Sequence, residues 1–338
     1  MREVRVALIG SGNIAVTLHL PILKMVGGVR VVALCDFIES RVEEVARRFE
    51  VKRTYNDVDL MLDSEELDAV FVTVSASAIS KVAAICLRRG VNTFLEKPPG
   101  FTAAETRELA GLAAEQNAIT MVGLNRRFRP LIRQARDVVE QEGPICTVIT
   151  EFHSRDMQSW QATGRFSDRD LRNFLVFNSI HAIDLLRYLG GDVEVVSASA
   201  SAVAPPGFLD SANAMIRFKS GAVGYVSSHH LVPAGGHLAP AGERVEIWGH
   251  RICAWLENGH RLLTIWRAGR PPEQLRASGE LMEWDGTKAQ NEFFIQCVQE
   301  GRQVRFPGAD LTDAVNTMEL VEVIGQSLGK PGLTVAHL

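Results

Sequence analysis

The sequence has little that would point to a membrane, a nucleic acid or a metal ion as its partner. No apolar run reaches the length of a membrane-spanning helix, and the formal net charge of −4 argues against nucleic acid or an anionic membrane as a main partner. The five cysteines are scattered and odd in number, without a C-x-x-C pair or another metal-ligand spacing. His229 and His230 end an expected strand but have no third ligand at a recognisable spacing, so we expect no metal site.

Composition and cysteine usage also suggest where the protein works and how many domains it has. Scattered cysteines in mostly apolar runs fit a reduced, cytoplasmic compartment. The first expected strand begins by Val4, so we expect no secretory leader. A length of 338 residues, with 46% hydrophobic and 22% charged residues, is typical of a globular protein of about two domains. We interpret the one basic cluster as a solvated helix face rather than a contact for an anionic group: Arg126, Arg127, Arg129, Arg133 and Arg136.

An apolar run at the start of the chain leads directly into a glycine-rich turn. The run over residues 4–9 is followed by Gly10-Ser11-Gly12-Asn13-Ile14-Ala15, which matches the G-x-G-x-x-(G/A) pattern. The first glycine allows a tight turn, the second lets the backbone approach a pyrophosphate, and the alanine allows close packing of helix and strand. A helix beginning near Asn13 would point its free N–H groups at the phosphates.

The acidic residue that such a motif requires is Asp36, which follows an expected strand over residues 29–35. In a dinucleotide-binding fold this carboxylate accepts hydrogen bonds from the adenosine ribose. A 2′-phosphate would meet it as a like charge, so we expect NAD rather than NADP. Arg41 lies close enough in sequence to weaken that preference. The alternative is that Asp36 caps a helix or forms a turn, since a helix begins near Ser40.

The two parts of the chain differ in their pattern of strands and helices. Up to residue 124 strands alternate with helices, which predicts a parallel sheet covered on both faces. Later strands are longer and have few crossover helices, which predicts a mainly antiparallel sheet with one face exposed or used for assembly. We expect an α/β protein with a doubly wound Rossmann domain over residues 1–124. We expect an α+β domain over residues 125–338, whose last helices can pack back on the first domain.

The expected elements are as follows. Strands are expected over residues 4–9, 29–35, 69–74, 93–95 and 119–123, and then over 145–153, 193–203, 212–218, 223–228, 245–248 and 262–266. Helices are expected over residues 39–49, 57–62, 80–89, 102–115, 171–189, 288–300 and 311–328.

Two polar groups outside the glycine turn are candidates for chemistry. Glu96-Lys97-Pro98 ends the fourth expected strand, where a lysine can reach a substrate oxygen beside the nicotinamide. The alternative for Lys97 is a strand-end lysine paired with Glu96 or solvent. Asn178, His181 and Asp184 recur every three residues on an otherwise apolar helix, which indicates either an active-site wall or a satisfied buried network.

Beyond these, residues that follow the strand over 145–153 can line a substrate pocket, although an ordinary surface loop is the alternative. Arg155 and Trp160 are the candidates in that segment. The charged stretch over residues 165–172 is expected to be solvated rather than to hold a substrate.

Together these motifs resemble the glucose–fructose oxidoreductase, inositol dehydrogenase and MocA-like oxidoreductases. The resemblance spans nearly the whole chain and includes the opening turn, His19-Leu20-Pro21, Glu96-Lys97-Pro98, Asn125-Arg126-Arg127-Phe128 with Pro130, and His181-x-x-Asp184. It implies a Rossmann domain, a second domain with a large, mainly antiparallel sheet, and a bound nicotinamide dinucleotide. It also implies a homodimer or homotetramer built on the open sheet face. It places Lys97 and His181 on either side of the substrate carbinol.

The resemblance leads to one main functional hypothesis and two alternatives. We expect hydride transfer between NAD and a sugar, cyclitol or related polyol, with His181 as the base and Lys97 as an ammonium donor to the developing alkoxide. Phe177 occupies the position where many members carry an aspartate. Ser75-Ala76 and Ser80 replace the Thr-Pro…His pattern of those members. These departures leave open a nucleotide-binding sensor or regulatory protein. A different reaction with tightly held NAD, such as cycling on one sugar or imine reduction, is the other alternative.

The expected site residues are therefore of three kinds. The catalytic pair is Lys97 and His181, and we expect His19 to be a structural helix residue rather than a catalyst. The substrate-binding candidates are Asn178, Asp184, Arg155 and Trp160. The cofactor-binding candidates are Gly10, Ser11, Gly12, Asn13, Ile14, Asp36, Arg41, Ser75, Glu96 and Lys97.

Overall fold

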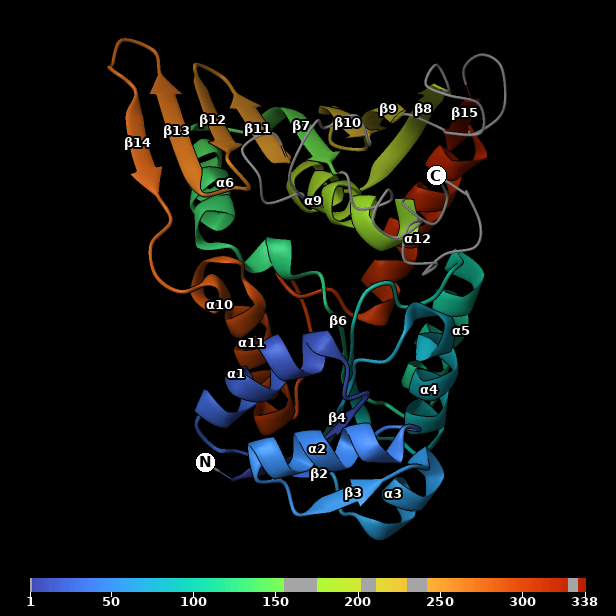
Figure 1. Ribbon diagram of the computed structural model, residues 1–338. Coiled ribbons are helices and arrows are strands. Elements are labelled where there is room, and N and C mark those ends of the chain that lie inside the picture. Colours follow the sequence, from blue (N-terminus) through green and yellow to red (C-terminus); the bar gives the residue numbers. More distant parts are fainter. Residues whose placement is uncertain (1, 155–174, 202–210, 230–241, 328–333) are drawn as a thin grey trace. The chain divides into compact units, whose positions relative to one another are not determined.

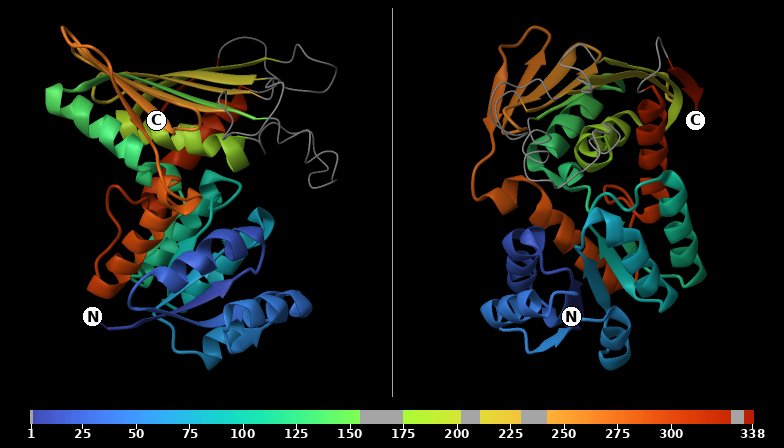
Figure 2. Two further views of the ribbon diagram at one scale, coloured as in Figure 1. Left: turned by 60° about the vertical axis from the view of Figure 1, so that its left-hand side comes forward. Right: turned by 45° about the vertical axis from the view of Figure 1, so that its right-hand side comes forward.

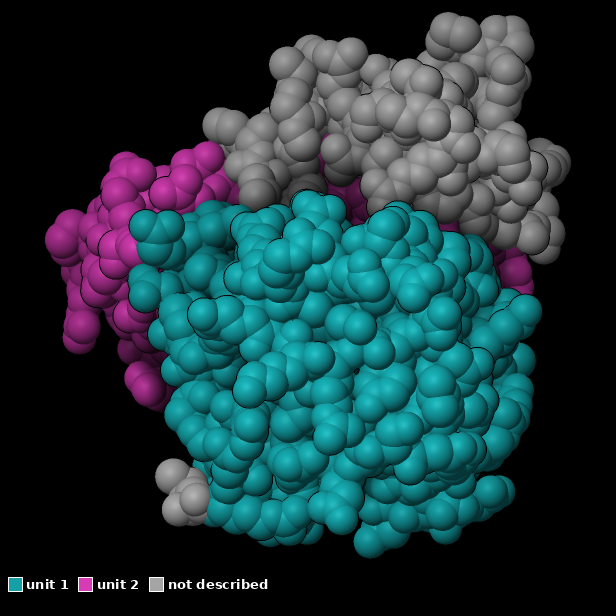
Figure 3. Space-filling model, turned by 60° about the horizontal axis from the view of Figure 1, so that its bottom comes forward, with its two compact units in different colours: residues 1–128, 280–316 teal, residues 129–279, 317–338 magenta. Residues whose placement is uncertain are grey.

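The chain folds into two compact units. A computed structural model describes residues 2–154, 175–201, 211–229, 242–327 and 334–338 (Figure 1). The first unit comprises residues 1–128 and 280–316, and the second comprises residues 129–279 and 317–338 (Figure 3). The first unit thus takes residues from two distant parts of the chain, whereas the sequence pattern alone places a domain boundary between residues 124 and 125.

The first unit is built around a parallel sheet of six strands. Their order, β3-β2-β1-β4-β5-β6, is that of a dinucleotide-binding Rossmann fold, so the predicted doubly wound sheet is confirmed. The strands are β1 (Val4–Ile9), β2 (Val29–Cys35), β3 (Arg53–Tyr55), β4 (Ala69–Val72), β5 (Asn92–Leu95) and β6 (Thr120–Val122). Strand β3 was not predicted, because its three residues are exposed or partly exposed and show no apolar period.

Helices cover both faces of this sheet (Figure 1). They are α1 (Leu20–Met25), which follows a π-helical turn over Ala15–His19, then α2 (Glu39–Phe49), α3 (Val58–Ser64), α4 (Ala76–Arg88), α5 (Ala103–Glu115), α10 (Leu281–Trp284), α11 (Thr287–Glu300) and the start of α12 (Leu311–Gln326). The side chain of Thr102 caps α5 by accepting a hydrogen bond from the N–H of Glu105 at 3.1 Å.

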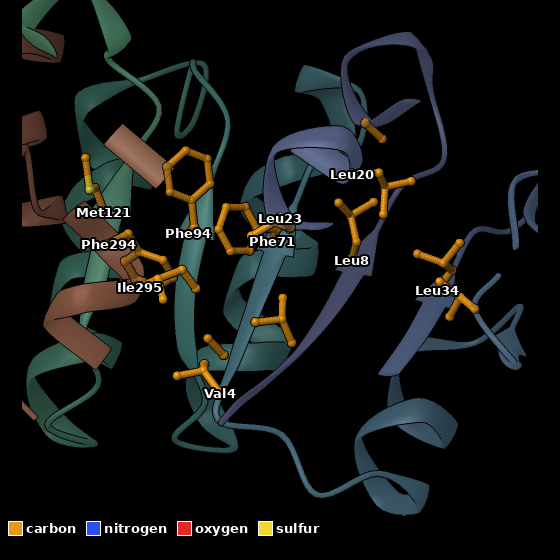
Figure 4. Packing of buried hydrophobic residues seen from close by; sticks show 14 of the residues in the cluster. Val4, Leu8, Leu20, Leu23, Leu34, Phe71, Phe94, Met121, Phe294 and Ile295 are labelled. Atoms are coloured by element: carbon orange, nitrogen blue, oxygen red, sulfur yellow. The ribbon is translucent and has the colours of Figure 1, made fainter. Parts of the chain in front are cut away.

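The core of the first unit contains three phenylalanines that come from distant parts of the chain (Figure 4). The rings of Phe71 on β4 and Phe94 on β5 stack at 4.7 Å between centroids. Phe294 on α11 meets both rings edge-on, at 5.5 and 5.7 Å. Because all three rings are fully buried, the late helix α11 completes a core that the first strands begin.

The second unit contains a sheet of nine strands in the order β14-β13-β12-β11-β7-β10-β9-β8-β15. All pairs are antiparallel except β7 with β10, so the predicted, mainly antiparallel sheet is confirmed. The strands are β7 (Ile145–His153), β8 (Val193–Ser201), β9 (Ser211–Phe218), β10 (Val223–His229), β11 (Glu243–Gly249), β12 (Ile252–Glu257), β13 (Leu262–Arg267), β14 (Glu273–Arg276) and β15 (Thr334–His337). Three strands, β12, β14 and β15, were not predicted.

The two faces of this sheet have different character. Helices α6 (Pro130–Glu142) and α9 (Ile180–Gly190) pack on one face (Figure 2). Side chains on that face, such as Val148, Ile216 and Leu256, are fully buried. The alternate residues of the same strands point to the other face, where Met215 is 60% exposed. In the part of the chain that the structure describes, no helix is long and apolar enough to span a bilayer.

The expectation of a solvated arginine face is wrong for three of the five arginines. Arg126, Arg127 and Arg129 are buried. Arg127 pairs with Asp313 at 2.7 Å, and Arg129 pairs with Glu243 at 2.5 Å. Arg133 on α6 is exposed, in agreement with the expectation. Sequence spacing could not reveal the buried carboxylates, because they lie more than a hundred residues away in the chain.

Replacing Phe294 with alanine tests whether α11 belongs to the core of the first unit. The substitution leaves a cavity against two buried rings, so we expect the free energy of unfolding to fall by about 3–5 kcal/mol in urea titrations followed by circular dichroism. Phe306→Ala is the matched control, because Phe306 is 59% exposed and its loss should cost no more than about 0.5 kcal/mol. Equal losses for the two variants would contradict this account of the core.

Candidate functional site

The glycine turn after β1 lies tightly against the end of β4. Gly10 has a φ of +99°, and a Cβ at this position would lie 2.7 Å from the carbonyl carbon of Thr73. The hydroxyl of Thr73 donates a hydrogen bond to the carbonyl of Gly10 at 2.7 Å. A Cβ at Gly12, by contrast, would have no heavy atom within 4 Å. The turn is therefore packed on one side and open on the other, as a backbone that receives a pyrophosphate must be.

The helix after this turn begins at Asn13, and it places unsatisfied N–H groups at the open side. Ile14 is 41% exposed there, although it follows a buried strand and turn. Ser75 begins α4 after the neighbouring strand β4, and its hydroxyl lies 3.1 Å from that of Ser77 rather than capping the helix. Both segments lie at the carboxyl ends of parallel strands, where ligands bind in this class of fold.

Asp36 holds the glycine turn. Its carboxylate accepts a hydrogen bond from the N–H of Ser11 at 2.7 Å and one from the N–H of Ile38 at 3.0 Å. Helix α2 begins only at Glu39, and no side chain caps it. Asp36 therefore does not cap α2, but its hydrogen bond from the N–H of Ile38 forms a turn, as the second half of that alternative predicted. The guanidinium of Arg41 lies 3.6 Å from the same carboxylate, so its charge is already engaged there.

Glu96 and Lys97 follow β5, at the same edge of the sheet. The N–H of Lys97 donates a hydrogen bond to Glu96 Oε2 at 3.2 Å, and the Lys97–Pro98 peptide is cis. Burial acts to raise the pKa of the Glu96 carboxyl. The hydrogen bond and charge of His19, with the charge of Lys97, outweigh burial and hold that pKa below its usual range.

The predicted polar stripe lies in the second unit and is buried. Asn178 is in a π-helical turn over Leu175–Ser179, and His181 and Asp184 are one helical turn apart on α9. The hydroxyl of Thr317 donates to Asp184 Oδ1 at 3.0 Å and accepts from Arg187 at 2.7 Å. Asp184 thus belongs to a buried hydrogen-bonded network. A satisfied buried network was one of the two alternatives for this stripe; the other was an active-site wall.

The remaining candidates divide between described and undescribed parts of the chain. Arg155 and Trp160 lie outside the described residues. His153 and His229 are paired on β7 and β10, with ring centroids 3.6 Å apart. Burial and then the charge of His153 lower the pKa of His229 to about 4, against the opposing charge of Glu151. Within residues 2–154, 175–201, 211–229, 242–327 and 334–338, no three His, Cys, Asp or Glu side chains form a group that could hold a metal ion.

One polar contact at this edge was not predicted from the sequence. His19, expected to be structural, lies 3.0 Å from Glu96 through its Nε2 atom. The signal available in the sequence was His19-Leu20-Pro21 on the first helix, which says nothing about a carboxylate 77 positions away.

Replacing Asp36 with serine tests its role in nucleotide recognition. Loss of a buried charged acceptor should raise the Kd for NADH by about tenfold or more in fluorescence titrations. Loss of the like-charge repulsion should at the same time narrow the preference for NADH over NADPH. Asp57→Ser is the matched control, because Asp57 caps α3 through the N–H of Leu60 and serine is also a good cap. An equal loss of NADH affinity in the control would assign the effect to stability rather than to recognition.

Comparison with known proteins assigns both parts of the chain to one protein family. Residues 4–124 match a family model described as an oxidoreductase family with an NAD-binding Rossmann fold. Residues 132–252 match the C-terminal domain of the same GFO/IDH/MocA group. The cofactor of this fold is NAD, as predicted, and the glycine turn, open helix start and Asp36 carboxylate fit such a dinucleotide.

Several curated and solved relatives agree with this match. Myo-inositol 2-dehydrogenase of Thermotoga maritima is 27% identical over 235 residues, which is 66% of this chain and 68% of the relative. D-apiose dehydrogenase of Paraburkholderia graminis is 30% identical over 201 residues, 58% of this chain and 52% of the relative.

Among solved structures, an oxidoreductase from Agrobacterium radiobacter in complex with NAD+, L-tartaric acid and magnesium has a TM-score of 0.86 at 20% identity, with 98% of both chains covered. A levoglucosan dehydrogenase in complex with NADH and levoglucosan has a TM-score of 0.83 at 20% identity, with 99% of both chains covered. On these sequence matches, the chain belongs to the GFO/IDH/MocA family of NAD-binding oxidoreductases, as the motif resemblance predicted.

Proposed function

We propose that this protein is an NAD(H)-dependent dehydrogenase that acts on a CH–OH group of a sugar, a cyclitol or a related polyol. The observation that carries the proposal is the glycine turn held by Asp36, within a chain whose relatives include dehydrogenases of inositol and apiose. The comparisons lend no support to the alternative of a sensor or regulatory protein. The five cysteines are all free, which supports the expectation of a reduced, cytoplasmic location.

The first unit supplies the residues for the dinucleotide. Gly10 to Ile14 would hold the diphosphate through backbone N–H groups, and Asp36 would accept the ribose hydroxyls. Arg41, Ser75 and the Glu96-Lys97 pair are the further proposed contacts. Bound NAD supplies a hydride acceptor, and the protein must supply the proton chemistry.

Lys97 and His181 are the residues that we assign to that proton chemistry. In the proposed reaction His181 takes the proton of the substrate hydroxyl, and Lys97 as an ammonium donates a hydrogen bond to the same oxygen as it becomes an alkoxide. A histidine works as a base near neutral pH without a large change in pKa, whereas a lysine would need strong desolvation. The ionised Glu96 beside Lys97 favours the ammonium form.

Asn178 and Asp184 are the proposed substrate contacts on the stripe with His181. Their support is that both side chains are buried: Asn178 in the π-helical turn that leads into α9, and Asp184 on α9 together with His181. Asp184 is held by Thr317, so it can offer a fixed acceptor to a hydroxylated substrate. Arg155 and Trp160 remain proposals from the sequence alone. Phe177, buried where many family members carry an aspartate, makes the surroundings of His181 less polar than in those members.

His181→Ala tests the assignment of the base. We expect turnover on the best substrate of a polyol panel, read at the absorbance of NADH, to fall by about 10²–10⁴-fold. The Kd for NADH should stay within about twofold, because the proposed nucleotide contacts all belong to the first unit. His250→Ala, at an exposed turn of the second unit, is the control and should leave turnover unchanged. A His181→Ala variant with normal turnover would remove His181 from the mechanism.

We also propose that the open face of the nine-stranded sheet joins copies of this chain into a homodimer or homotetramer. Met215 and Val223 are exposed there, on adjacent strands, in register with Tyr225 and Arg217 respectively. Trp255 and Trp266 lie on the same face, with ring centroids 4.5 Å apart and ring planes tilted by 57°. Exposed apolar groups on a sheet face that no described helix covers are typical of an assembly surface.

Met215→Glu tests this surface by sedimentation. A charge at the centre of an apolar interface should shift the protein from the wild-type oligomer toward the monomer. Leu60→Glu, an equally exposed site on α3 in the first unit, should sediment like the wild type. A monomeric wild type, or an oligomer that Met215→Glu leaves intact, would refute this interface.

A further inference from the structure

A chain of buried polar side chains lies behind Lys97 in the first unit. The amide of Asn291 on α11 lies 3.0 Å from His19 Nδ1. His19 Nε2 lies 3.0 Å from Glu96 Oε1, and the N–H of Lys97 bonds the other oxygen of that carboxylate. Because an ionised carboxylate only accepts, His19 Nε2 carries a proton and donates it to Glu96 Oε1. The four residues thus form one connected path that ends at Lys97.

Two members of the path are enclosed by the core, whereas Glu96 and Lys97 are partly exposed. His19 and Asn291 are fully buried, and the imidazole packs on the rings of Phe71 and Phe94 at 5.7 and 5.3 Å. A Cβ at Gly123, after β6, would lie 2.8 Å from Glu96 Oε1. Glycine at this position leaves the space that the carboxylate fills. A larger residue would have to push Glu96 away from His19.

Buried polar groups are costly unless they are satisfied. Helix α11 brings the Asn291 amide to His19 Nδ1 from a distant part of the chain, although Asn291 Oδ1 itself has no hydrogen-bond partner among the described residues. A histidine that served only helix packing would not need both ring nitrogens in hydrogen bonds. Glu96 is ionised at neutral pH, because His19 and Lys97 together outweigh the effect of burial on its pKa. The result is a fixed negative charge directly beside the lysine.

We propose that Asn291, His19 and Gly123 are positioning residues, which hold the Glu96 carboxylate so that it fixes the backbone and the positive charge of Lys97. The inference rests on the proposed function for its meaning in catalysis. In this assignment Lys97 stays an ammonium that donates a hydrogen bond. It does not take the proton of the substrate hydroxyl, which goes to His181 in the proposed reaction. His19 itself touches neither substrate nor cofactor in this assignment.

The test measures the titration of Lys97 directly in the full-length protein. Lysine side chains are dimethylated with 13C-formaldehyde, and the Lys97 signal is identified by its loss in Lys97→Arg. In Glu96→Gln, which keeps the shape of the side chain, the apparent pKa of Lys97 should fall by about one unit or more, because an adjacent negative charge is lost. His19→Phe, which keeps a ring against Phe71 and Phe94, and Gly123→Ala should move it in the same direction.

Tyr55→Phe is the matched control. It also removes a hydrogen bond to a partly buried carboxylate of the first unit, that of Glu65 at 2.7 Å, but it has no connection to Glu96. Its Lys97 titration should match the wild type. If His19→Phe does not fold, Glu96→Gln and Gly123→Ala still decide the question. An unchanged Lys97 titration in Glu96→Gln, or a shift as large in Tyr55→Phe, would overturn the proposal.

Kinetics then connect the path to the proposed reaction. His19→Phe should lower kcat by about tenfold or more and shift the pH profile of kcat, with the Kd for NADH within about twofold of the wild type. A fall in kcat without any change in pH profile would indicate a merely structural histidine and would count against the proposal. The titration of Lys97 does not depend on turnover. A wild-type protein that is inactive on every polyol would refute the proposed function, but the titration would still test whether Asn291, His19 and Gly123 position Glu96.

Discussion

The first unit depends on the close approach of the glycine turn to the end of β4. A side chain at position 10 would collide with the backbone of Thr73 and Val74, so the turn can close only around a glycine with positive φ. Closure brings the N–H of Ser11 within reach of Asp36, which ties β1 to β2. The same closure leaves the start of the following helix open at the carboxyl edge of the sheet. The open helix start is where we propose that the diphosphate of NAD binds.

In the described parts of the chain, three buried or partly buried charged groups have hydrogen-bond partners from distant segments. Glu96 is held by His19, Asp184 by Thr317, and Arg129 by Glu243 and His260, each within one unit. Such groups are expensive to bury alone, so each defines a local geometry that tolerates little displacement. Glu96 is adjacent to Lys97, and Asp184 is on the same helix as His181. We assign Lys97 and His181 to substrate chemistry, which requires a fixed geometry.

Fold class was accessible from the sequence because both sheets show their period clearly. The strands β2 and β7 and the helix α2 have the predicted bounds, since apolar spacing and turn residues agree there. Short β3 and the late strand β15 were missed, because few of their residues face a core. The glycine turn and Asp36 could be read from the sequence because a local motif carries their geometry.

What the sequence by itself determined is the local chemistry: a strand, a glycine turn and an acidic residue that together specify a dinucleotide fold, and a lysine at a strand end. Only the tertiary structure decided which groups meet across long sequence separations. His19 with Glu96 and Asn291, Arg127 with Asp313, and Phe294 with two strand residues are such pairs. The physical reason is that burial and hydrogen-bond partners arise from packing, and no residue spacing encodes a partner that arrives from a distant segment.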